Sequence, residues 1–172
     1  MATTRTSGGR SLVGWFFLAA GIVYLLGILF AHVATSLSSG WWNFFAFALI
    51  AIGMFLLFLW RSDLLLRIAF IVAAVGWALL AIGSVASLSG LTTLAIILAL
   101  IGTLVAGILV FIRHLFTRNA DLAFLLMAIF AALVLLAVGA WVAFLGGTLG
   151  VIISIIFGIL LIVSGLFIQR RR

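Results

Sequence analysis

Few side chains in this sequence could do chemistry, and the densest group of uncharged polar ones comes early in the chain. His32 precedes Ser36 by about one helical turn, so the two share a face, and Asn43 follows just across the next turn. Histidine changes charge near neutral pH, and hydroxyl and amide groups hold small polar ligands by hydrogen bonds. One interpretation is an acidity sensor or a polar-ligand site; the other is a hydrogen-bonded histidine at a membrane interface.

The two carboxylates of the chain each follow an arginine and precede an apolar run. Arg61 shortly precedes Asp63, and Arg118 shortly precedes Asp121. A helix N-terminus exposes unpaired N–H groups and a partial positive charge, so we predict that both carboxylates cap helices. The alternative is an ion pair or a proton site that uses Arg61 and Arg118.

The rest of the sequence offers little to an enzyme. It contains no Cys, Glu, Lys or Pro, which excludes thiolate metal sites, cysteine nucleophiles and lysine Schiff bases. No phosphate-binding loop, dinucleotide fingerprint or catalytic triad can be assembled. Two histidines without an acidic partner at ligand spacing do not form a metal site. We therefore predict a non-enzymatic protein with no catalytic residues, no cofactor and no metal.

The composition indicates where these residues are embedded. Of the 172 residues, 69% are apolar and 6% charged, whereas soluble domains carry about 25% charged residues. A bilayer core needs about 20 apolar residues per helix, and continuously apolar runs exclude transmembrane strands. The sequence predicts an all-α polytopic membrane protein, a single membrane domain over residues 1–172. Its six predicted transmembrane helices are 12–34, 41–60, 64–86, 91–112, 122–145 and 147–168.

The basic residues predict the orientation of these helices. All nine arginines lie at the two termini and at the junctions after the second and fourth helices, which share one side of the membrane. The opposite turns carry no Arg or Asp. The positive-inside rule therefore places both termini in the cytoplasm, and a nucleic-acid partner is not expected. Exclusive use of Arg, with abundant Ala, Gly, Leu and Val, favours a bacterial plasma membrane.

Glycine spacing predicts how the helices pack. The chain divides into three similar helical hairpins, at about 12–60, 64–112 and 122–168, each with a short Gly-containing turn. Small residues also recur every seven positions, which makes smooth stripes on which another helix can approach closely. The glycines that we assign to such packing faces are Gly14, Gly21, Gly76, Gly83, Gly139, Gly158 and Gly165.

The last hairpin carries a resemblance to a known family. Gly146-Gly147-Thr148-Leu149-Gly150 is followed by an apolar run from Gly158 to Gly165 that looks like a family repeat. The sequence resembles the HdeD-type short-repeat proteins, six-helix proteins of the bacterial inner membrane. That resemblance implies a role in stress or acid resistance, and it assigns no functional residues.

Three functional hypotheses follow. The favoured one is a structural or accessory membrane protein that packs, through its glycine stripes, against a larger membrane complex or a second copy. The second is an HdeD-like acid-resistance protein that uses His32 as its sensor. The third is a carrier or channel for a neutral or apolar solute.

Overall fold

The computed structural model describes residues 6–33, 39–86, 89–139 and 147–170, and helices account for nearly all of them. The described residues contain no strand, and each of the six helices is long and apolar enough to cross a membrane. The predicted all-helical architecture with six membrane-spanning helices is therefore confirmed. The helices are α1 (Thr6–Val33), α2 (Ser39–Trp60), α3 (Leu64–Ala86), α4 (Ser89–Arg113), α5 (Arg118–Val138) and α6 (Gly147–Gln169).

The first helix begins at Thr6, before its predicted start at residue 12. The fifth helix departs from its predicted bounds at both ends. It begins at Arg118, because the side chain of Thr117 accepts a hydrogen bond from the backbone N–H of Ala120 and caps the helix. It ends at Val138 and is followed by Gly139, whose N–H donates to the carbonyl of Leu135. Hydropathy alone does not mark this end, since the apolar run continues in the sequence. Residues 140–145 of the predicted helix lie outside the described residues.

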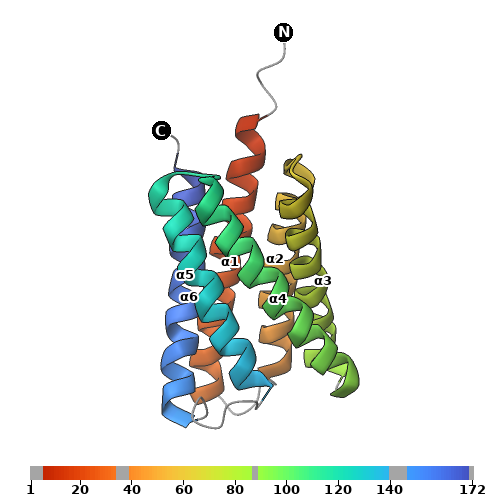
Figure 1. Cartoon of the computed structure of the whole chain (residues 1–172). Coiled ribbons are helices and arrows are strands. Elements are labelled where there is room, and N and C mark those ends of the chain that lie inside the picture. The colour runs from red at the N-terminus through yellow and green to blue at the C-terminus, as the bar shows by residue number, and fades with distance from the viewer. Residues whose placement is uncertain (1–5, 34–38, 87–88, 140–146, 171–172) are drawn as a thin grey trace.

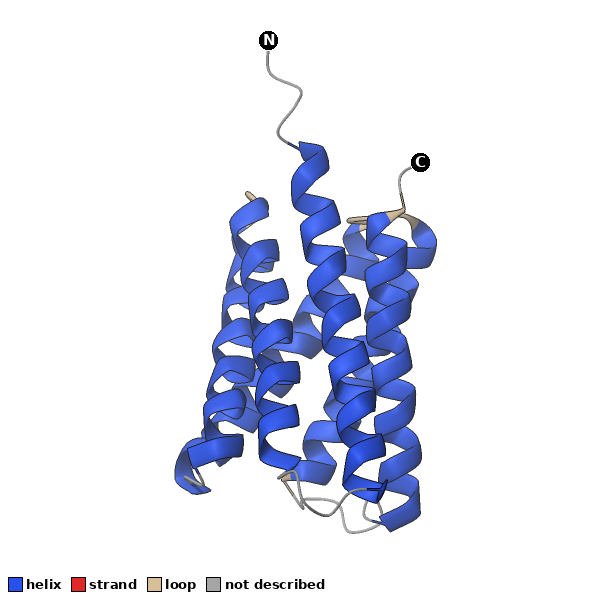
Figure 2. Ribbon diagram, turned by 180° about the vertical axis from the view of Figure 1, so that it is seen from behind, coloured by secondary structure: helices blue, strands red, loops and turns tan. Residues whose placement is uncertain are grey.

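The helices form a closed ring in chain order. Each helix packs against its neighbours in the sequence, and α6 closes the ring by packing against α1 (Figures 1 and 2). Successive helices run in opposite directions, so α1 begins and α6 ends at the same end of the bundle (Figure 1). We call this the charged end. Its described arginines are Arg10, Arg61, Arg67, Arg113, Arg118 and Arg170.

The opposite end of the ring, which we call the uncharged end, holds no Arg or Asp among its described residues. It contains the end of α1 and the start of α2, the end of α3 and the start of α4, and the end of α5 and the start of α6. The contrast between the two ends is the strongest asymmetry of the described molecule.

Paired glycines close the ring between α1 and α6. A Cβ atom on Gly14 would lie 2.7 Å from the carbonyl oxygen of Gly165, and one on Gly21 would lie 2.8 Å from that of Gly158. These separations are shorter than ordinary van der Waals contact. The two backbones can therefore approach this closely only because both helices lack side chains at matching positions.

The contact between α3 and α4 also depends on glycines that face the backbone of the other helix. A Cβ atom on Gly76 would clash with the backbone of Ala99, and one on Gly102 would clash with that of Ala73. Gly83 lies nearer the uncharged end, where its Cβ would lie 2.9 Å from Oγ1 of Thr92. The glycine faces of α1, α3 and α6 thus contact helices of the same chain.

Large aromatic side chains fill the interior of the ring. Phe17 of α1 meets Phe124 of α5 edge to face, with ring centroids 5.8 Å apart, although these two helices are not neighbours. Trp77 of α3 stacks on Phe157 of α6 at 6.1 Å. All four rings are buried. They join helices that are not neighbours in the ring. We call the buried aromatic side chains inside the ring the aromatic core.

Candidate functional site

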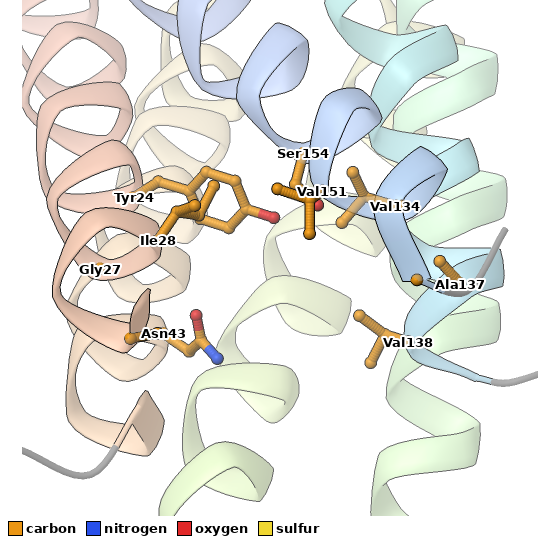
Figure 3. A pocket seen from close by; sticks show the side chains of 12 residues that line it. Tyr24, Gly27, Ile28, Asn43, Val134, Ala137, Val138, Val151 and Ser154 are labelled. Carbon is orange, nitrogen blue, oxygen red and sulfur yellow. The ribbon is translucent and has the colours of Figure 1, made fainter. Parts of the chain in front are cut away.

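A cavity of about 340 Å³ lies between α1, α2, α5 and α6, in the half of the ring nearer the uncharged end (Figure 3). Its wall on α5 and α6 is apolar except for Ser154, and it includes Val134, Val138 and Val151. Glycines on α1 and α6 leave part of the space open. The volume lies in the lower part of the range of about 300–1,000 Å³ that is usual for small-molecule pockets.

Three uncharged polar side chains face this cavity. The phenol of Tyr24 on α1 points across the pocket toward Ser154 on α6 (Figure 3). The amide of Asn43 on α2 points into the cavity nearer the uncharged end (Figure 3). The described residues that line the cavity include no Arg, Asp or His. Such a lining suits a neutral ligand, because a buried ion without a partner is costly.

Tyr24, which lines the cavity, belongs to a group of packed aromatic rings. Tyr24 packs edge-on against Phe157 at 5.3 Å, and Phe47 contacts Trp77 at 5.3 Å. Trp77 and Phe157 stack on each other, which joins both pairs into one layer. The indole N–H of Trp77 donates to Oγ1 of Thr103 at 2.9 Å and fixes the ring in place. This layer belongs to the aromatic core and separates the cavity from the charged end.

Two junctions at the charged end are tied to each other. Arg61 donates to the carbonyl of Leu115 at 3.1 Å, and its guanidinium lies 4.1 Å from the ring centroid of Trp60. Asp63 forms an ion pair with Arg113 and accepts from the backbone N–H of Leu65 at 3.1 Å, at the start of α3. The segment between α2 and α3 therefore holds the segment between α4 and α5.

Asp121 is buried in the first turn of α5. One carboxylate oxygen accepts the backbone N–H of Phe116 at 2.9 Å, and the other lies 3.8 Å from Nδ1 of His114. Only 1% of the residue is exposed. His114 itself has a left-handed backbone (φ 48°), and such a conformation is costly unless its surroundings hold it. Asp121 thus holds the tight turn that leads into α5.

The predicted carboxylate sites differ in detail from this arrangement. Thr117, not Asp121, occupies the cap position of α5. Asp63 does hydrogen bond at the first turn of α3, but its ion-pair partner is Arg113 rather than Arg61. Arg118 is exposed and forms no ion pair with Asp121 among the described contacts. Arg61 is not the ion-pair partner of Asp63 because its guanidinium points across the junction and donates to the carbonyl of Leu115, between α4 and α5.

The remaining predicted residues are placed as follows. Of the predicted polar cluster, Asn43 lines the cavity, whereas the side chain of His32 and the whole of Ser36 lie outside the described residues. Gly139 follows the end of α5 and is the one member of the glycine set that caps a helix.

Sequence reasoning missed Tyr24 and Ser154 as partners in one site. The available signal was weak: the only tyrosine of the chain and an isolated serine within an apolar run. They lie far apart in the sequence, and only the closure of α6 onto α1 brings them together.

Comparison with protein-family models, curated proteins and solved structures finds no significant match to this chain.

Proposed function

We propose that this chain is a multi-pass protein of the bacterial plasma membrane that binds a small neutral solute in the cavity near its uncharged end. The observation that carries the proposal is the cavity itself, about 340 Å³ in volume, with an apolar wall and three uncharged polar groups. A carrier for a neutral or apolar solute needs such a site. The aromatic core argues against an open channel, because it fills the ring interior on the side of the cavity that faces the charged end.

The distribution of arginines supports an orientation with both termini in the cytoplasm. Arginines are favoured on the cytoplasmic side of membrane helices, and the described arginines lie at the charged end. With that end in the cytoplasm, the cavity lies in the outer half of the bundle. Solute would then enter from outside the cell.

We also propose that the cavity binds its solute without transforming it. A phenol, a hydroxyl and an amide can hold a neutral molecule by hydrogen bonds. Acid–base catalysis most often uses His, Asp, Glu or Lys, and the described lining supplies none of these.

The accessory-subunit hypothesis loses its main support. Glycines at six of the seven assigned positions, on α1, α3 and α6, are covered by helices of the same chain. A larger complex or homo-oligomer would have to use the outward sides of the helices. The stress-resistance hypothesis keeps only the resemblance of the last hairpin to the HdeD-type repeat. Replacing His32 by Gln tests it: unimpaired survival of the variant in acid would contradict a sensor role.

Topology can be measured directly because the natural chain contains no Cys. We expect a membrane-impermeant maleimide to label Thr148→Cys at the uncharged end in intact cells. Ser62→Cys at the charged end is the matched control, and it should react only after the membrane is permeabilised. Both residues are exposed. Labelling of Ser62→Cys in intact cells would overturn the proposed orientation.

Solute binding can be tested by native mass spectrometry of the protein extracted from its own membrane. We expect the wild type to retain a small molecule and Val151→Phe to lose it, because Val151 lines the cavity. Val105→Phe is the matched control, since Val105 is exposed on α4. If Val151→Phe retains as much of the molecule as the control, that molecule is not in the cavity.

A further inference from the structure

The cavity has two chemically different walls. The valines lie on α5 and α6, whereas the facing wall, formed by α1 and α2, adds the polar groups of Tyr24 and Asn43 to the apolar Ile28 and Ala31 (Figure 3). Ser154 stands between them, and the phenol of Tyr24 points toward it (Figure 3). A ligand that fills this space would therefore meet apolar surface on one side and hydrogen-bonding groups on the other.

The side chain of Asn43 has unused hydrogen-bonding capacity. Its amide carries two donor hydrogens and an acceptor oxygen, and among the described residues it makes no side-chain hydrogen bond. Because the amide points into the cavity (Figure 3), a ligand that occupies this space can hydrogen bond with it.

Charge on the ligand is disfavoured by the surroundings. The described lining carries no side chain with a formal charge, and the arginines lie at the charged end, beyond the aromatic core. An ion moved from water into this cavity would lose its hydration without gaining a counter-ion.

From these observations we infer that the ligand is a compact neutral amphiphile, with an apolar body against the valine wall and a single hydroxyl or amide head that hydrogen bonds with Asn43. The inference rests on the proposed function, because it assumes that the cavity binds a solute. It adds the class of solute and names the residue that selects it.

Three probes of one shape separate the contributions: 1-naphthol carries a neutral hydroxyl, naphthalene has none, and 1-naphthoate is charged at neutral pH. Equilibrium dialysis against the full-length protein in nanodiscs measures each dissociation constant, and empty nanodiscs correct for partition into lipid. The wild type should bind 1-naphthol about 2- to 10-fold more tightly than naphthalene, as one neutral hydrogen bond allows. Binding of 1-naphthoate should be weakest.

Asn43→Leu should remove the preference for 1-naphthol over naphthalene and still bind naphthalene. The matched control is Asn119→Leu, because Asn119 is the only other asparagine and is exposed at the charged end. This control should keep the preference. The comparison of the three probes on the wild type needs no variant. It therefore tests the preference for a neutral hydroxyl even if Asn43→Leu does not fold.

The outcomes are distinguishable. No binding of any probe above that of empty nanodiscs would overturn the proposed function together with this inference. Equal binding of naphthol and naphthalene by the wild type, or an unchanged preference in a folded Asn43→Leu, would overturn the inference alone. Tighter binding of 1-naphthoate would overturn the requirement for a neutral ligand.

Discussion

At the scale of single residues, burial decides how much each polar contact contributes. Asp121 is almost fully buried and satisfies a backbone N–H, whereas the ion pair of Asp63 with Arg113 is partly exposed. Removing the partner of a buried donor costs about 1–3 kcal/mol. Exposed ion pairs contribute about 0–1 kcal/mol. The two carboxylates of the chain should therefore differ in importance.

We expect Asp121→Ala to lower the free energy of unfolding by about 1–3 kcal/mol, because the N–H of Phe116 loses its acceptor. Asp121→Asn should restore most of the loss, since it keeps an acceptor oxygen. Asp63→Asn should cost less than about 1 kcal/mol. Denaturant unfolding in mild detergent measures all three. An equal loss for Asp63→Asn and Asp121→Ala would contradict the importance of burial.

At the scale of elements, glycines set the distance between helices. The α1–α6 and α3–α4 contacts are both closer than a Cβ atom permits at Gly14, Gly21 and Gly76. In lipid the hydrophobic effect does not drive helices together, so close backbone packing has to supply the association energy. This explains why a chain with so few hydrogen-bonding side chains forms a defined ring.

Gly76→Ala should destabilise the fold by at least about 1–3 kcal/mol, because the added methyl group overlaps the backbone of Ala99 and forces α3 and α4 apart. Gly90 is the matched control: nothing lies within 4 Å of a Cβ added there. Gly90→Ala should be neutral or slightly stabilising, since Ala favours a helix more than Gly does. The measurement is thermal unfolding in detergent. Similar effects at both positions would show that α3 and α4 do not depend on this contact.

At the scale of the whole molecule, the ring encloses a cavity near the uncharged end, and aromatic side chains fill its interior toward the charged end. Trp77, Phe157, Phe17 and Phe124 reach across the ring from α3, α6, α1 and α5. The aromatic core therefore both holds the ring together and blocks a path along its axis. A carrier built in this way has to move these rings in order to pass a solute.

Trp77→Ala should open part of that block and make proteoliposomes more permeable to glycerol, measured by stopped-flow light scattering. It should also lower the free energy of unfolding by about 3–5 kcal/mol, as is typical when a large buried aromatic is removed. Trp41→Ala is the matched control, because Trp41 is exposed, and it should leave permeability unchanged. Unaltered permeability in folded Trp77→Ala would show that this ring is not the barrier.

The sequence by itself determined the number of membrane-length helices, because continuous apolar length is a local property that bilayer thickness turns into structure. Apolar length did not predict the end of α5, because the helix is capped at Gly139 although the sequence remains apolar beyond it. Glycine spacing pointed to packing faces, but it could not say which helix each face meets.

Only the tertiary structure decided those partners and, with them, the candidate site. Gly14 and Gly165 meet because α6 closes the ring onto α1, and the same closure brings Ser154 to Tyr24. Asn43 was predicted to lie near His32 and Ser36, whose side chains are outside the described residues, and it is found in the wall of a cavity that four helices build together. Periodicity records which side of a helix is smooth or polar, whereas a cavity depends on distances between helices that only the packed ring specifies.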